Sequence, residues 1–366
     1  MKINQLLPGF GSGDAISNYA LQLQAILRGW GHESEIYCES RHVGPTEEHL
    51  CRDYRRCPAP GDPSDITIYH YSIGSALTDF FRHMRGRKVL IYHNITPHTW
   101  FQGIHDEKAR SLWEGREELK RLAGVPDLAL GVSEFNRREL EAFGFARTAV
   151  LPLILDQARL SAMPDAGFLK RYGDGAVNIL FVGRMAPNKK VEDLIKIYYY
   201  YRTTINTNSR LLLAGSLIGM DRYTSHLRAL ITMLDLPDVT FFNHVTDAEL
   251  YALYRTASIF LCMSEHEGFC IPLLEAVYFR VPVLAYAAAA VPETLAGTGV
   301  LVVKKDHAAI AELIDRVLGD PSLREAIVHT QAPRVAAFST EAVAGRLREL
   351  LSDWLMRADG ERCRCS

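Results

Sequence analysis

The 366-residue sequence contains no long apolar run and no excess of charge of either sign. Its most apolar stretch, residues 283–291, is nine residues long, whereas a helix that spans a bilayer needs about 20. The 41 Lys and Arg residues are balanced by 43 Asp and Glu residues, so the chain lacks the overall basic surface that nucleic-acid binding requires. We therefore expect neither a membrane-spanning protein nor a nucleic-acid partner.

Cysteine is scarce, and its spacing fits no common framework. The seven cysteines are an odd number, and Cys51 and Cys57 have no second pair of metal ligands near them in the sequence. No apolar signal segment follows Met1, so we expect reduced thiols in a cytoplasmic protein and exclude a disulfide-stabilised scaffold. Cys363 and Cys365 lie in a polar tail, and we do not expect them to bind a metal.

Segments typical of β-strands alternate with apolar-periodic helical segments along the whole chain. In the first part, strands are expected at residues 2–7, 34–38, 65–70, 88–92, 127–132 and 148–153, and helices at 17–31, 106–122 and 134–143. The pattern restarts with strands at 177–182, 210–214, 239–242, 258–263, 281–285 and 300–303. This order predicts an α/β protein with two doubly wound, parallel-sheet domains.

A lapse in this periodicity predicts the boundary between the domains. Between Asp156 and Ala176, a proline and several glycines are scattered among polar residues, and we place the interdomain connection there. The N-terminal domain is then expected over residues 1–157 and the C-terminal domain over 175–337. Ligands of doubly wound sheets bind beyond the carboxyl ends of the strands, so the loops that follow the strands are where chemistry is expected.

The strongest functional signal is the segment SEHEGFCIPLLEA, residues 264–276. It follows a predicted strand, and Pro272 suits the first turn of a helix. Glu267 then lies in the turn, and Glu275 lies about one turn into the helix. The first N–H groups of such a helix suit a phosphate, which a carboxylate would repel. We therefore expect both glutamates to accept hydrogen bonds from hydroxyl groups, such as those of a sugar and a ribose.

A second segment, FVGRMAPNKK at residues 181–190, also leads from a strand into a helix. It is expected to bring Arg184 and Lys189 to one edge of the sheet. Two cations at one edge suit a diphosphate leaving group, because a guanidinium group binds two oxygens and an ammonium group acts as a point charge.

Together these segments resemble the signature pair of the family 4 retaining glycosyltransferases, here EGFCIPLLE and VGRMAPNK. Further matches are PGFGSGD (residues 8–14), YHNITP (92–97), GVSEF (131–135) and NHVTDAEL (243–250). The resemblance extends over essentially the whole chain. It implies the GT-B fold, in which two Rossmann-like domains face each other across a cleft, and a nucleotide-sugar as the donor.

The resemblance also implies a role for each matching position. Arg184 and Lys189 would bind the donor diphosphate, Glu275 the ribose hydroxyls and Glu267 the transferred sugar, and His93 would lie over the sugar near the reacting carbon. The expected catalytic set is therefore Glu267, His93, Arg184 and Lys189. The other expected donor-binding residues are Gly11, Gly13, Asn243, His244, Val245, Gly268, Phe269, Cys270 and Ile271. For His93 an ordinary strand-end histidine is the alternative, and His70 is expected to be such a strand-end histidine.

The sequence departs from the family pattern at Cys270 and Asn243, which stand where the family commonly has glycine. It contains no Asp-x-Asp triplet, so the cationic side chains and a helix terminus are expected to neutralise the diphosphate in place of a divalent metal. Neither a metal nor another cofactor is expected.

The last expected helix, about residues 340–357, carries an apolar stripe. In GT-B enzymes the last helix crosses back to the N-terminal domain, and the resemblance implies the same course here. Ser339 is the expected cap, and Phe338 and Val343 stand at staple positions. The stripe consists of Val343, Leu347, Leu350, Leu351, Trp354 and Leu355.

These observations predict a retaining hexosyltransferase that acts on a saccharide or a lipid-linked saccharide, typically in surface polysaccharide biosynthesis. GDP-mannose is the favoured donor, and UDP-glucose or UDP-galactose is the alternative. A nucleotide-sugar epimerase, a phosphorylase-like enzyme and a non-catalytic nucleotide-sugar-binding protein are competing classes on the same fold. The basic segment 82–88, which follows Phe80 and Phe81, is interpreted first as a solvated helix end before a strand, and weak contact with the inner face of a membrane is the alternative.

Overall fold

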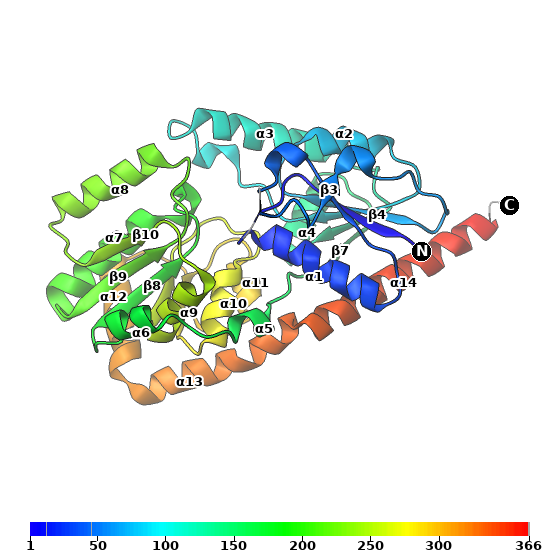
Figure 1. Cartoon of the computed structure of the whole chain (residues 1–366). Coiled ribbons are helices and arrows are strands. Elements are labelled where there is room, and N and C mark those ends of the chain that lie inside the picture. Colours follow the sequence, from blue (N-terminus) through cyan, green and yellow to red (C-terminus); the bar gives the residue numbers. More distant parts are fainter. Residues whose placement is uncertain (12, 45, 365–366) are drawn as a thin grey trace. The chain divides into compact units, whose positions relative to one another are not determined.

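The structure is a computed structural model that describes residues 1–11, 13–44 and 46–364, with side chains as far as residue 356 (Figure 1). The chain divides into two compact units. Unit 1 contains Met1–His98, Glu107–Ile154 and the segment that begins at Phe338. Unit 2 contains Thr99–Asp106 and Leu155–Ala337. Cys365 lies outside the described residues, and Cys363 lies beyond the described side chains.

Unit 1 contains a seven-stranded parallel sheet of order β3-β2-β1-β4-β5-β6-β7. The strands are β1 (Ile3–Leu7), β2 (Ile36–Cys38), β3 (Arg52–Asp53), β4 (Ile66–Tyr71), β5 (Arg87–Tyr92), β6 (Leu128–Gly131) and β7 (Thr148–Val150). The accompanying helices are α1 (Ala15–Gly29), η1 (Ser40–His42), η2 (Tyr54–Arg56), α2 (Ala76–His83), α3 (Asp106–Arg121), α4 (Glu134–Ala142) and α14 (Thr340–Arg364). The short η3 (His98–Trp100) begins at the last residue of the first segment and continues into Thr99–Asp106 of unit 2. The strand order reverses between β1 and β4, so the loops after these two strands diverge and leave space for a ligand.

Unit 2 contains a six-stranded parallel sheet of order β10-β9-β8-β11-β12-β13. Its strands are β8 (Val177–Val182), β9 (Ser209–Ala214), β10 (Val239–Phe242), β11 (Ile259–Cys262), β12 (Val283–Tyr286) and β13 (Val300–Val302). Its helices are α5 (Gln157–Leu160), α6 (Ala166–Tyr172), η4 (Pro187–Lys189), α7 (Val191–Tyr200), η5 (Tyr201–Ile205), α8 (Asp221–Met233), α9 (Asp247–Thr256), α10 (Ile271–Tyr278), α11 (Val291–Leu295), α12 (His307–Gly319), α13 (Pro321–Gln331) and η6 (Ala332–Phe338). Here the strand order reverses between β8 and β11.

The sheets are parallel and doubly wound, as the alternation of segments predicts, and most strand ends differ from the predicted ones by one or two residues. The structure corrects the prediction that residues 156–176 connect the two domains, because this stretch forms α5 and α6 within unit 2. The carboxylates of Asp156 and Asp165 cap these helices by accepting hydrogen bonds from the N–H groups of Arg159 and Phe168, at 2.9 and 2.7 Å. Helices of four and seven residues are too short for an apolar period to appear in the sequence.

The basic segment 82–88 gives no support to a membrane contact. Phe81 is fully buried, and Phe80 packs edge-on against Tyr54 with ring centroids 5.2 Å apart. The ammonium group of Lys88 donates to the carbonyl of Arg82 at 2.9 Å. Phe80 and Phe81, the side chains that would insert into a membrane, therefore pack within unit 1. Among the residues that the structure describes, no helix combines the length and apolarity that crossing a bilayer requires.

Helix α14 belongs to unit 1, although more than 180 residues of sequence separate it from the preceding part of that unit. Ser339 caps its start by accepting from the N–H of Ala342 at 3.2 Å. Its apolar stripe is buried, with Leu347 at 1% exposed, and α14 contacts α1. Trp354 also lies under the guanidinium group of Arg87, 5.8 Å from the ring centroid. The helix therefore completes the core of unit 1.

We predict that Leu347→Ala destabilises unit 1 by about 2–5 kcal/mol, because it removes a fully buried side chain and leaves a cavity. Met356→Ala is the matched control, since this side chain is on the same helix and 67% exposed. Urea unfolding of both variants, with hydrogen exchange followed in residues 1–150, measures the effect. Unchanged exchange in residues 1–150 of Leu347→Ala would show that α14 does not support this unit.

Candidate functional site

The loop after β8 and the loop after β11 are joined by hydrogen bonds through Asn188. The side-chain amide of Asn188 donates to the carbonyl of His266 at 2.9 Å, and the Asn188 carbonyl accepts from the N–H of Glu265 at 2.9 Å. Asn188 is buried, at 4% exposed, so these bonds are shielded from water. They hold the next residue, Lys189, beside the loop that carries Glu267.

Lys189 and Glu267 form a largely buried ion pair. The Lys189 ammonium nitrogen lies 2.6 Å from the Glu267 carboxylate, and the two side chains are 19% and 8% exposed. Burial by itself would lower the pKa of Lys189, but the carboxylate of Glu267, close by and hydrogen-bonded to it, outweighs this effect and raises that pKa. The lysine is therefore held in its charged form, next to the carboxylate that the sequence assigned to the sugar.

Two thiols complete this cluster. The ligand atoms of Cys262, Glu267 and Cys270 all lie within 4.8 Å of one another. The pKa of Cys270 is raised by its hydrogen bond with Cys262 and by burial. Because Cys270 favours the neutral thiol and Lys189 already neutralises Glu267, these residues would hold a metal ion only after losing the ion pair.

Cys270 adopts a left-handed backbone conformation, with φ 75° and ψ 63°. Residues other than glycine pay about 1–3 kcal/mol for such a conformation. The geometry gives the physical reason why glycine suits this position, immediately before α10. The cysteine at 270 thus adds a thiol to the site at the expense of local strain.

Glu275 has surroundings different from those of Glu267. It lies one turn into α10, where its carboxylate accepts a hydrogen bond from the Tyr254 hydroxyl at 2.7 Å. Burial raises the pKa of Glu275, and this effect exceeds the opposing ones of Tyr254 and the Arg159 guanidinium group. The two glutamates thus differ in charge environment, since one is paired with an ammonium group and the other with a neutral phenol.

The remaining predicted residues of unit 2 lie after β8 and β10. The guanidinium group of Arg184 is exposed and donates to the Ile218 carbonyl at 3.2 Å. The side-chain carbonyl of Asn243 accepts from the Leu217 N–H at 2.9 Å. His244 is exposed, and Val245 is half-buried. Arg184 and Asn243 therefore both contact the loop after β9, whereas Lys189 contacts Glu267, so the two predicted cations have separate partners.

Because β10, β9, β8 and β11 are neighbours in the sheet, the loops that follow them share one edge. That edge carries the predicted cations, the segment 243–245 and the segment 267–275. Gly268, Phe269 and Ile271 lie in the same stretch, and the Phe269 carbonyl accepts from the Thr294 hydroxyl.

A third cation at this edge was missed by the sequence analysis. The ammonium group of Lys305, which follows β13, lies 2.7 Å from a Glu265 oxygen and 2.8 Å from an Asp193 oxygen. It also donates to the Met263 carbonyl at 2.9 Å. Burial would raise the pKa of Asp193, but Lys305 reverses this and lowers it. Lys305 therefore anchors the β11 loop two residues before Glu267. The sequence feature that could have identified Lys305 is its position shortly after a predicted strand.

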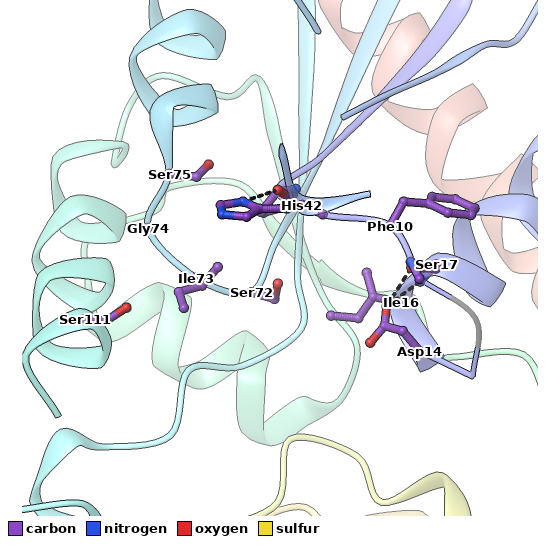
Figure 2. A pocket seen from close by; sticks show the side chains of 13 residues that line it. Phe10, Asp14, Ile16, Ser17, His42, Ser72, Ile73, Gly74, Ser75 and Ser111 are labelled. Atoms are coloured by element: carbon purple, nitrogen blue, oxygen red, sulfur yellow. Dashed lines mark hydrogen bonds between the residues drawn. The ribbon is translucent and has the colours of Figure 1, made fainter. Parts of the chain in front are cut away.

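Unit 1 has its own cavity at the carboxyl ends of β1 and β4, with a volume of about 520 Å³ (Figure 2). Gly11 lines it, and its N–H donates to the Ser17 hydroxyl at 3.2 Å. Gly13 has a φ of 74°, which glycine adopts readily. Asp14 caps α1 by accepting from the N–H of Ser17 at 2.8 Å. The polar side chains of the cavity are those of Asp14, Ser17, His42, Ser72, Ser75 and Ser111.

His93 follows β5 and is not among the described residues that line this cavity. Its Nε2 atom lies 2.9 Å from Nδ1 of His70, which comes from the neighbouring strand β4. Burial lowers the pKa of His93 well below its ordinary value, and the nearby His70 lowers it further. The structure therefore separates the predicted residues of unit 1, with Gly11 at the cavity, Gly13 outside its described lining and His93 against His70.

We predict that the Lys189–Glu267 pair is strongly coupled. Lys189→Met or Glu267→Gln should each lower the free energy of unfolding by about 3–5 kcal/mol, because either leaves a buried charge unpaired. The double variant should be less destabilised than the sum of the two. Lys190→Met is the control, since Lys190 pairs with Glu192 in a more exposed position and should cost at most about 1 kcal/mol. Additive effects in urea unfolding would contradict the coupling.

Comparison with known proteins finds a family pattern in unit 2. Residues 172–332 match the family model described as glycosyl transferases group 1. The capsular polysaccharide biosynthesis glycosyltransferase CapM of Staphylococcus aureus is 29% identical over 184 residues, which cover 50% of this chain and 47% of CapM. The O-antigen chain mannosyltransferase B of Escherichia coli is 26% identical over 268 residues, which cover 72% of this chain and 69% of that protein. The chain thus spans about half the length of the first of these relatives.

The fold has close counterparts among solved structures. Sucrose-phosphate synthase from Thermosynechococcus elongatus superposes with a TM-score of 0.73 at 19% identity, covering 98% of this chain and 100% of that one. The two parallel-sheet units are therefore those of the GT-B fold, and the second unit carries the sequence pattern of the group 1 glycosyl transferases.

Proposed function

We propose that this protein is a retaining hexosyltransferase that moves a sugar from a nucleotide-sugar to a saccharide or a lipid-linked saccharide. GDP-mannose is the favoured donor, and surface polysaccharide synthesis in the cytoplasm is the proposed setting. The observation that carries the proposal is the Lys189–Glu267 pair beside the start of α10, within the segment that matches the glycosyl transferases group 1. The name of the E. coli relative, a mannosyltransferase, supports the choice of sugar.

In the proposed mechanism, Lys189 and Arg184 neutralise the diphosphate as the bond to the sugar breaks. Negative charge develops on the leaving group in this step, and prearranged cations stabilise it. A diphosphate oxygen competes with Glu267 for the Lys189 ammonium group. The carboxylate then becomes available to the hydroxyls of the sugar and to the positive charge at the reacting carbon. Binding of the donor diphosphate to Lys189 would thus release the Glu267 carboxylate at the same time.

The cavity of unit 1 is proposed to bind the acceptor. Its hydroxyl groups and the Asp14 carboxylate are hydrogen-bonding partners of a polyol, and its described lining contains neither lysine nor arginine (Figure 2). A phosphate would gain little there, since the Asp14 carboxylate would repel it and the described lining offers no ammonium or guanidinium group to balance that charge. The cavity therefore favours the uncharged sugar portion of an acceptor, whether that sugar is free or attached to a lipid.

The most direct test is incubation with a panel of nucleotide-sugars without acceptor, with the released sugar followed by NMR. We expect slow release of mannose from GDP-mannose, with the α-anomer appearing before mutarotation. Release from UDP-glucose or UDP-galactose alone would select the alternative donors. Inversion at the anomeric carbon would contradict the retaining assignment. Binding of nucleotide-sugars with no release, and no transfer to any saccharide tested, would favour a non-catalytic binding protein.

A second prediction separates the two glutamates. Glu275→Ala should weaken binding of both the free nucleoside diphosphate and the whole donor about 5- to 30-fold, since it removes a partner of the ribose. Glu267→Ala should leave diphosphate affinity unweakened, because Lys189 loses its competing carboxylate, while transfer falls about 10²–10³-fold. Calorimetry with GDP and initial rates measure the two effects. An equal loss of GDP affinity in both variants would contradict the division of roles.

A further inference from the structure

A chain of hydrogen bonds leads from helix α1 through the sheet of unit 1 to His93. The side-chain amide nitrogen of Gln5 donates to the Ala20 carbonyl at 3.0 Å. The Gln5 side-chain oxygen lies 2.9 Å from Nε2 of His70, and Nδ1 of His70 lies 2.9 Å from Nε2 of His93. Gln5 and His70 are both fully buried, so water does not compete for these atoms.

Each link in this chain fixes the next one. The Ala20 carbonyl only accepts, so the Gln5 amide presents nitrogen to it and oxygen to His70. His70 must then carry its proton on Nε2. Burial lowers the pKa of His70 to about 3, so the ring is neutral and its Nδ1 has a free electron pair. His93 must therefore donate from its own Nε2, and its Nδ1 is left without a proton.

The last atom in this series of hydrogen-bonded groups is Nδ1 of His93, and it is the atom that a ligand could contact. Nδ1 of His93 is buried and has no hydrogen-bond partner among the described residues, although buried polar atoms are rarely left unpaired. The Tyr19 ring makes T-shaped contacts with both imidazoles, and its centroid lies 6.0 Å from that of His70 and 5.7 Å from that of His93. This packing opposes rotation of either ring. An oriented, unpaired acceptor thus lies one residue beyond the carboxyl end of β5.

We propose that Gln5 and His70 are positioning residues that hold His93 with its proton on Nε2, so that Nδ1 accepts a hydrogen bond from a hydroxyl of a bound sugar. The last clause rests on the proposed transferase function. The proposed proton positions on His70 and His93 rest only on contacts within unit 1. In this arrangement the sugar hydroxyl donates to Nδ1 of His93, whereas with the proton on Nδ1 the same hydroxyl would have to accept instead.

The test combines NMR with kinetics. In protein labelled with ¹⁵N-histidine, long-range ¹H–¹⁵N spectra at pH 7 distinguish the two neutral forms of imidazole. His70→Asn and His93→Asn assign the signals. We expect both rings to be neutral with the proton on Nε2. A proton on Nδ1 of His93, or a charged ring at either position, would overturn the proposal whether or not the protein is a transferase.

The Gln5→Glu variant tests the direction of the chain. A carboxylate favours a charged His70, which would donate from Nδ1 and move the proton of His93 to its own Nδ1. We expect this inversion in the spectrum, a kcat/KM for transfer lowered about 5- to 30-fold, and unchanged affinity for GDP. Gln24→Glu is the matched control, because Gln24 is also buried and donates to a backbone carbonyl, that of Ser34, at 2.9 Å.

The outcomes separate the proposal from the proposed function. Inversion at His93 with transfer equal to that of Gln24→Glu would overturn the role of Nδ1 toward the sugar. If Gln5→Glu does not fold, Gln5→Met removes the acceptor of the His70 proton, and the spectrum should then show a mixture of proton positions on His93. A single, unchanged proton position on His93 would overturn the proposed hydrogen-bond arrangement. A wild-type protein without transfer would remove the proposed function, while the spectra still decide the proton positions.

Discussion

The ion pair between Lys189 and Glu267 is the interaction on which the candidate site of unit 2 depends. Two largely buried, oppositely charged groups need each other, because each alone would face a large cost of desolvation. The surroundings are arranged to keep them together. Asn188 joins their two loops, and Lys305 holds the β11 loop through Glu265. A neutral pair of side chains would not need such support, and it would offer no cation to an anionic ligand.

The position of this pair follows from the topology of the sheet. In each unit the strand order reverses once, at β1/β4 and at β8/β11, and each reversal separates the loops on its two sides. In unit 2 the reversal lies between the strand that precedes Lys189 and the strand that precedes Glu267. In unit 1 it lies between the strands that precede the glycine loop and the serine-lined turn of the cavity. The equivalent position in the sheet thus carries charged side chains in unit 2 and mainly hydroxyl-bearing side chains in unit 1.

The sequence was sufficient to predict the parallel sheets and the edge at which the site residues gather, because strand, turn and helix leave patterns a few residues long. Pro272 marked the start of α10, and Ser339 marked the start of α14. The partners of the site residues could not be predicted in this way. Lys189 meets Glu267 across 78 positions of sequence, and Lys305 meets Asp193 across 112. His70 was expected to be an ordinary strand-end histidine, and it lies next to the end of β4, but its bond to His93 depends on the register of two adjacent strands.

The place of α14 has a consequence for how the chain is made. Unit 1 is built from both ends of the described sequence, and unit 2 is inserted between them. During synthesis, residues 155–337 follow the first part of unit 1 before α14 appears, an interval of roughly 10–40 s at ordinary rates of translation. Throughout that interval the surface of unit 1 that receives Leu347 and Trp354 is uncovered, while all of unit 2 becomes available to fold. The nascent chain is therefore expected to finish its second unit before its first, and to be most prone to aggregation just before its last helix emerges.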